Sequence, residues 1–429
     1  MPLVKADRAP MSDSAIHAML NEGSLVELTR IQRELGREQV PSWYRDAWRK
    51  RHAAAADVLR ARQTPCVVRE MALVLHNVTY YLGTVEPPEQ PNYYQYTDAR
   101  MLDWYLASAS DLDSFEQLSV DGVHALCDDL RRVETAFLAD AEPGPGIDAP
   151  SIRQRIALLD RVLADLAAIG ARQRAPGAAC ETVEEYVRAA SRIPALVHLA
   201  AMPLTPHHDE YAFLRVLQGS ELCFFGIRIA VSAAIEAVKA QQPAQAAIDV
   251  AAATRFAEVL CGLLRVLRTM PVSHFAAFRY NTGSASAIQS INFQMLDIVL
   301  HGANGAKVPH LLRFEHLAAV ARMADPRFVS LHAAVRHANA PGAEWDAFRE
   351  ACRRLDRTLL TWRGLHLSFA KTYIPNDGPG TGGTSGAAYL REHLLRGIFD
   401  DGEPDWDAIE ELFPAGPVRR VRPGVAIAP

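Results

Sequence analysis

Apolar side chains recur at alternating steps of three and four residues along nearly all of this 429-residue chain. This spacing places them on one face of an α-helix, whereas the strict alternation typical of half-buried strands is almost absent. The pattern therefore predicts an all-α fold, in which amphipathic helices pack around a shared core. We expect helices over 14–36, 42–62, 66–83, 97–109, 113–140, 151–173 and 182–192, and again over 205–242, 246–269, 289–300, 307–322, 326–337 and 343–374.

Two proline-rich segments, 86–91 and 141–146, interrupt the helical pattern of the first half. We predict an N-terminal helical region over 1–195, whose role the sequence does not indicate. A second helical domain over 196–429 carries the informative motifs. The aromatic segment 92–96 is better explained by packing against the main body than by ligand binding.

The longest amphipathic stripe ends the second half. Its members, which are all apolar or aromatic apart from one histidine, are Phe348, Cys352, Leu355, Leu359, Trp362, His366, Phe369 and Tyr373. His366 occupies a position where a leucine would be expected, so its imidazole should point into the packed interior. A lone histidine on an apolar face is more often a hydrogen-bonded core residue than a metal ligand.

A glycine-rich run, Gly380–Gly386, begins about fourteen residues after His366. It matches neither the dinucleotide-binding nor the phosphate-loop pattern, and alone it is equally well explained as a flexible loop. An inward imidazole followed by a loop rich in backbone donors is, however, what a haem site with a small polar substrate requires.

An arginine in the middle of the second half is a candidate for substrate recognition. Phe275 and Arg279 are four residues apart, so they share one face if the segment is helical. A loop rich in glycine, serine and asparagine follows over 281–286. The planar guanidinium of Arg279 suits a carboxylate, and the alternative is an ordinary surface arginine.

Composition and charge narrow the classes of partner. The chain carries 45 basic and 50 acidic residues, for a net charge of −5, and it has no long basic run, so we expect no nucleic-acid partner. None of the six cysteines has redox or zinc-site spacing. No signal peptide and no apolar run of membrane-spanning length is present. These features favour a soluble, cytoplasmic protein with no membrane association.

Four stretches of the second half resemble the tryptophan 2,3-dioxygenase and indoleamine 2,3-dioxygenase superfamily of haem enzymes. They spread over roughly 200–395 and follow the order of the family motifs. The stretches are His208–Leu222, Phe275–Arg279, Gly283–Gln294, and Trp362–His366 with the loop Gly380–Gly386.

The resemblance implies a haem b cofactor held by the last of these stretches. His366 would be the proximal ligand of the haem iron. Arg363, which precedes it by one helical turn on the same side, would reach a haem propionate.

The resemblance also implies a substrate pocket for an aromatic amino acid, with O₂ as the second substrate. Arg279 and Thr381 are the expected catalytic residues: Arg279 pairs with the carboxylate, while Thr381 and the amides of Gly380 and Gly382 close over the carboxylate and the ammonium group. The remaining expected members of the pocket are Phe213, Leu217, Phe275 and Ser284.

One position departs from the tryptophan enzymes, which carry a distal histidine where this chain has Leu217. The indoleamine branch also lacks that histidine, so oxygenation is not excluded. The partner expected for an indole N–H is nevertheless missing. Length and layout are closer to a bacterial branch that includes the chlorotryptophan-rearranging enzyme of the pyrrolnitrin pathway, which suggests secondary metabolism.

Three functions therefore stay open. The leading hypothesis is a haem-dependent oxygenase that inserts dioxygen at the C2–C3 bond of an indole-type amino acid. The second keeps the haem and changes the reaction to mono-oxygenation, peroxide-driven hydroxylation or ring rearrangement. The third is a non-catalytic protein that binds haem or an aromatic ligand. The sequence leaves the oligomeric state open, a homo-oligomer included.

Overall fold

Every regular element that the structure describes is a helix, and none of the described residues forms a strand, which confirms the all-α prediction. The structure is a computed structural model. It describes residues 12–21, 42–61, 64–83, 92–140, 148–170, 180–189, 192–200, 203–205, 207–283, 285–302, 307–323, 329–338, 341–374, 390 and 397–399.

The helices of the first half match most of the predicted ranges. They are α1 (Asp13–Asn21), α3 (Ser42–Arg60), α4 (Cys66–Gly83), α5 (Tyr93–Tyr96), α6 (Ala99–Leu106), α7 (Leu112–Asp140), α8 (Ala149–Ala168), α9 (Val183–Arg188) and α10 (Ile193–Leu199). The helix expected over 97–109 forms as the shorter α6. Asp98 adopts a left-handed conformation with φ 53°, which separates α5 from α6.

The second half contains the longest helices. Its elements are α11 (His208–Lys239), α12 (Pro243–Leu267), α13 (Val272–Arg279), η2 (Tyr280–Thr282), η3 (Ala287–Gln289), α14 (Ile291–His301), α15 (Val308–Leu311), η5 (Glu315–Leu317), α16 (Ala318–Met323), α17 (Leu331–His337) and α18 (Ala343–Tyr373). The helical conformation of α13 confirms that Phe275 and Arg279 lie on one face.

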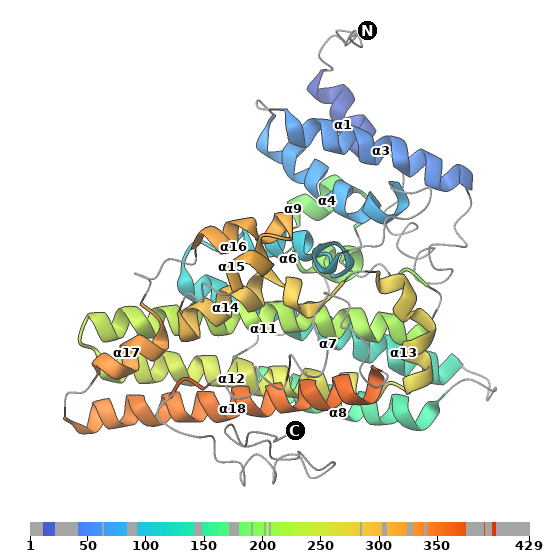
Figure 1. The fold of residues 1–429 in the computed structure, drawn as a ribbon. Helices are drawn as coiled ribbons and strands as arrows, with labels where there is room; N and C mark the ends of the chain where they lie inside the picture. Colours follow the sequence, from blue (N-terminus) through green and yellow to red (C-terminus); the bar gives the residue numbers. More distant parts are fainter. Residues whose placement is uncertain are drawn as a thin grey trace, which may run out of the picture.

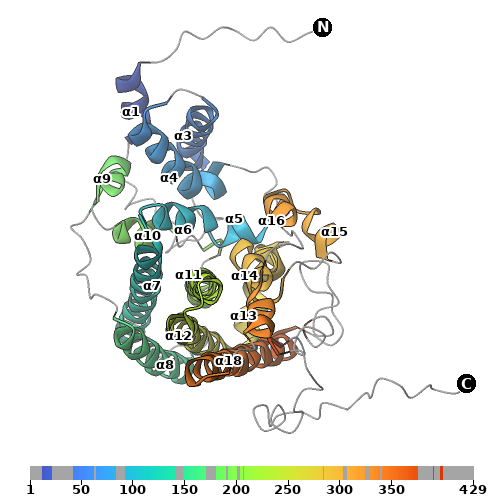
Figure 2. The same cartoon turned by 90° about the vertical axis from the view of Figure 1, so that its left-hand side faces the viewer.

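Helix α11 lies in the middle of the bundle. Figure 1 shows α11, α12 and α18 running lengthwise beside one another, and Figure 2, which looks along these helices, shows the others arranged around α11. Helix α11 packs against α7, α12 and α14, while α12 packs against α8 and α18. Because α11 is surrounded on nearly all sides, its buried positions include polar as well as apolar residues.

Glycines allow α11 and α12 to approach closely. A Cβ atom at Gly226 would lie 2.8 Å from the ring of Phe256, which is fully buried on α12. At Gly219 a Cβ atom would lie 3.2 Å from a terminal methyl of Leu263. The absence of side chains at these two positions therefore sets the short separation of the two central helices.

The first helices form a layer at one side of the bundle, with α3, α4 and α1 at the top of Figure 1. Helices α6 and α10 connect this layer to α7. The buried residues of the layer and of the bundle belong to one continuous apolar cluster, to which α7 and α8 contribute together with α11 and α12. Core contacts thus cross the predicted division at residue 195, and the division itself stays a prediction.

Within the described ranges, no helix has both the length and the apolar character that crossing a bilayer requires.

Candidate active site

A mainly apolar cavity of about 240 Å³ lies beside α11 and brings together residues from both halves of the chain. Its walls come from α5, α11, the end of α12, α13, the segment before α14, α14 itself and α18. The predicted site residues that line this cavity are Phe213, Leu217, Phe275, Arg279, Arg363 and His366.

His366 lies on α18 and faces the cavity, as the apolar stripe predicted. Its ring is tilted by 35° against that of Trp362, with 5.6 Å between the ring centroids. Burial lowers the pKa of His366 to about 4, so the imidazole is neutral near pH 7. His366 is half-buried as a residue and is among those that line the cavity.

The hydrogen bonding of His366 separates the two explanations of a buried histidine. Within the part of the chain that the structure describes, no hydrogen bond of the His366 ring is found. A core histidine that packs only for stability would be expected to have such a partner. A neutral imidazole with an available lone pair has instead the chemistry of a metal ligand.

Arg363 lies on the same helix and places a cation at the edge of the cavity. Its Nη2 is 3.2 Å from Nε2 of His301, the last residue of α14. A guanidinium can only donate, so Nε2 of His301 accepts and its Nδ1 carries the hydrogen. This contact directs Arg363 toward the wall that α14 and α18 share.

Arg279 ends α13 and provides a second cation at the cavity. Its guanidinium carbon lies 5.8 Å from the ring centroid of Phe275, which is one turn earlier. Among the described residues, none offers Arg279 a carboxylate within ion-pair distance. Phe213 of α11 packs its ring against Phe275 and Phe278 at centroid distances of 5.6 and 5.5 Å. The cation is therefore held beside an aromatic wall.

Leu217 lines the cavity on α11, one turn after Phe213. The position where the tryptophan enzymes carry a histidine is thus an aliphatic surface of the cavity in this chain. Ser220, on the next turn, also lines it, and its hydroxyl donates to the Val216 carbonyl at 2.7 Å.

Four predicted residues, Ser284, Gly380, Thr381 and Gly382, lie outside the described residues. Ile374 and Leu390, which stand on either side of the glycine-rich run in the sequence, both line the cavity.

Helix α5 contributes two tyrosines to the cavity that the sequence pattern did not single out as site residues. Tyr93 and Tyr96 line the cavity, whereas the sequence favoured packing over ligand binding for the aromatic segment 92–96. The hydroxyl of Tyr93 donates to Oε1 of Glu221 at 3.0 Å, and that of Tyr96 donates to Oε1 of Glu210 at 3.2 Å. Both acids are buried on α11, about three turns apart. Two acids buried on a central helix require hydrogen-bond donors, and this requirement could have pointed to the tyrosines of segment 92–96.

Tyr93 also connects α5 to the segment before α14. Its backbone N–H donates to Oε1 of Gln289 at 2.8 Å, while Asn292 donates to the other carboxylate oxygen of Glu221 at 3.1 Å. Burial raises the pKa of Glu221, and the hydrogen bonds from Ser290, Asn292 and Tyr93 act in the opposite direction. Tyr93 is therefore held by hydrogen bonds of both its side chain and its backbone. We call the side of the cavity formed by Tyr93 and Tyr96 the tyrosine wall.

Substituting Tyr93 with phenylalanine removes one donor from a fully buried carboxylate. We expect Tyr93→Phe to lower the free energy of unfolding by about 1–2 kcal/mol, measured by denaturant titration. Tyr94→Phe is the matched control: the hydroxyl of Tyr94 donates to Asp103 at 2.7 Å in an exposed position, so its loss should cost less. Equal losses in the two variants would contradict the importance of the Tyr93–Glu221 bond.

Known proteins were compared with the chain. No family model matches it. Tryptophan 2,3-dioxygenases of Polaromonas sp. and Pseudomonas fluorescens are 29% identical to it over 238 residues, which cover 47% of this chain and 81% and 84% of those proteins. The tryptophan 2,3-dioxygenase of Bacillus cereus is 26% identical over 238 residues. The motifs of its second half follow the family order, and together with these relatives they make the chain similar to the haem superfamily of tryptophan 2,3-dioxygenase and indoleamine 2,3-dioxygenase.

Proposed function

We propose that this protein is a haem-dependent oxygenase that inserts dioxygen into the indole ring of an aromatic amino acid. One observation carries the proposal. A neutral imidazole without a hydrogen bond among the described residues, His366, and a guanidinium without a carboxylate partner there, Arg279, line the same apolar cavity. The relatives named as tryptophan 2,3-dioxygenases support the same reaction.

The residues of the cavity fit haem b. His366 would bind the iron through its available nitrogen, since burial keeps the ring neutral. Arg363 would pair with a propionate from the edge of the cavity. When bound, the haem supplies the binding and activation of O₂. The protein contributes the remaining requirements, which are binding, orientation and the exclusion of water.

The substrate would be oriented by its two chemically distinct ends. Arg279 would pair with the carboxylate, and Phe213 and Phe275 would pack against the aromatic ring. The apolar walls exclude water, so the pairing with Arg279 is stronger than it would be in solvent. Thr381, with Gly380, Gly382 and Ser284, is proposed to complete the binding of the amino-acid group.

The role of His366 can be tested by absorption spectroscopy. We expect the purified wild-type protein to show a Soret band and His366→Ala to lose it or to show it strongly reduced and shifted, because the variant removes the iron ligand. His207→Ala is the control, since that histidine is exposed at the start of α11 and makes no capping bond. An unchanged Soret band in His366→Ala would refute the assignment.

The role of Arg279 can be tested by substrate titration. Removing one charge-assisted contact costs about 1.5–3 kcal/mol, so Arg279→Ala should weaken the binding of L-tryptophan by about 10- to 150-fold. The affinity of Arg279→Lys for L-tryptophan should lie between those of the wild type and Arg279→Ala, because lysine keeps the positive charge but lacks the planar pair of N–H donors. Arg313→Ala removes an exposed arginine from the turn after α15, and this variant should bind as the wild type does. The proposed contact is wrong if Arg279→Ala also binds L-tryptophan normally.

Leu217 favours a second candidate function. An aliphatic residue at this point of the cavity offers no base and no partner for an indole N–H, so a haem-dependent mono-oxygenation or ring rearrangement would suit it as well. A non-catalytic haem carrier is less well supported, because such a protein has no need of Arg279 in the cavity.

The two reactions differ in the oxygen atoms that reach the product. Under ¹⁸O₂, we expect mass spectrometry to find two labelled oxygen atoms in the product formed from L-tryptophan. A product with one label or none would replace dioxygenation by the second candidate, and the same measurement under ¹⁶O₂ with ¹⁸O-labelled water identifies oxygen taken from solvent.

A further inference from the structure

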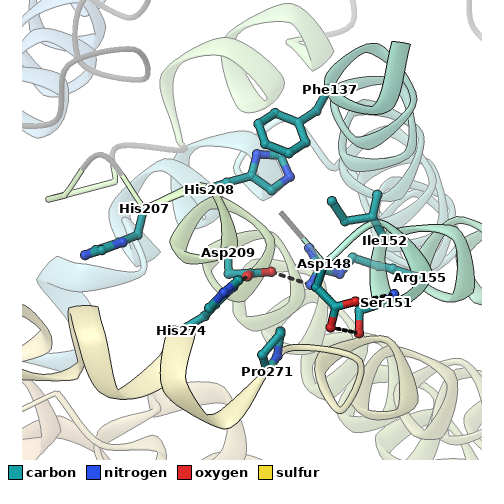
Figure 3. A pocket seen from close by; sticks show the side chains of 10 residues that line it. All are labelled: Phe137, Asp148, Ser151, Ile152, Arg155, His207, His208, Asp209, Pro271 and His274. Atoms are coloured by element: carbon teal, nitrogen blue, oxygen red, sulfur yellow. Dashed lines mark hydrogen bonds and ion pairs between the residues drawn. The ribbon is translucent and has the colours of Figure 1, made fainter. Parts of the chain in front are cut away.

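A cluster of charged side chains surrounds the start of α11 and joins four helices (Figure 3). Arg155 of α8, which is only 1% exposed, forms ion pairs with Glu134 of α7 and with Asp209 of α11. Its Nε donates to the Thr269 hydroxyl, two residues after α12, at 3.0 Å. One guanidinium therefore fixes the relative positions of α7, α8, α11 and the end of α12.

Asp209 connects this ion-pair cluster to a further helix, α13. Its Oδ1 accepts from Arg155, and its Oδ2 lies 2.5 Å from Nδ1 of His274 on α13. Burial alone would raise the pKa of Asp209, but the charge of Arg155 and the hydrogen bonds from His274 and Arg155 outweigh it and lower that pKa. Asp209 is thus a carboxylate that only accepts, so Nδ1 of His274 carries the hydrogen.

Among the described residues, helix α13 has few other polar side-chain contacts that could fix its rotation. It has eight residues, starts at Pro271 without a side-chain cap, and is too short to be stable by itself. Phe275 and Phe278 anchor it through aromatic packing, in which Phe275 meets Phe369 and Tyr373 of α18 edge to face. Such contacts have looser geometric requirements than a hydrogen bond to a carboxylate. The bond from His274 is directional, and it acts in the first turn, immediately before Phe275.

We propose that Asp209 and His274 are positioning residues: their hydrogen bond sets the rotation of α13 and thereby places the Arg279 guanidinium, at the other end of that helix, in the cavity. The inference rests on the proposed role of Arg279 in binding the amino-acid carboxylate. Neither Asp209 nor His274 lines that cavity, so both act through α13 and not by touching the substrate.

The variants are chosen to separate the bond from general stability. His274→Leu removes the donor, whereas His274→Asn retains an N–H donor near the position of Nδ1. His207→Leu is the matched control, because His207 lines the same pocket as His274 but lies exposed at the start of α11. Asp209 is left unchanged, since its loss would also leave Arg155 short of an ion-pair partner.

The first measurement is amide hydrogen exchange of the full-length, haem-loaded protein, without added substrate. We expect His274→Leu to accelerate exchange in residues 272–279 at least about tenfold while α12 is unchanged, and His274→Asn to restore the wild-type rate within about threefold. The bond does not hold α13 if His274→Leu exchanges as the wild type does, or if His274→Asn exchanges as fast as His274→Leu.

The second measurement is a double-mutant cycle on the binding of L-tryptophan. His274→Leu should raise the dissociation constant about tenfold when Arg279 is present and less than about twofold in Arg279→Ala, because its effect passes through that guanidinium. Equal effects in both backgrounds would overturn the link to Arg279. If wild-type protein binds no L-tryptophan, the proposed substrate fails, and the exchange measurement still decides whether His274 holds α13.

Discussion

The interior position of α11 is the constraint on which the other features depend. A helix that other helices surround on nearly all sides has little surface open to solvent, yet α11 buries several charged or polar side chains. These are Asp209, Glu210, Arg215, Gln218 and Glu221. Each needs a partner inside the protein, because an unpaired polar group at such depth would cost a large share of the small net stability of a fold.

The partners of these side chains explain why the surrounding helices lie where they do. Asp129 of α7 pairs with Arg215 at 2.5 Å, and the carbonyl of Thr97, just after α5, accepts from Gln218 at 3.3 Å. Helices α5, α7, α8 and α13 are each fastened to α11 by at least one such bond. These bonds also position the candidate active site, because α5 and α13 form two of its walls.

Local periodicity was sufficient for much of this arrangement. The stripe on α18 predicted the inward direction of His366, and the four-residue step predicted the shared face of Phe275 and Arg279, because both depend only on the geometry of one helix. The tyrosine wall could not be found in that way: Tyr93 and Tyr96 meet their acids across 128 and 114 residues of chain. The same holds for His274, whose partner Asp209 is 65 residues away. Haem itself came from the resemblance, not from the pattern.

The bond between α5 and α11 has a consequence for how the protein could be divided. All the motifs that resemble the dioxygenases lie after residue 195, so a shorter chain beginning there would keep every one of them. It would nevertheless lose the phenol groups that donate to Glu210 and Glu221, and each acid left without this donor would cost about 1–3 kcal/mol or draw water into the cavity. The part of the chain that carries no recognisable motif thus supplies the hydroxyl donors of two buried acids and one side of the cavity.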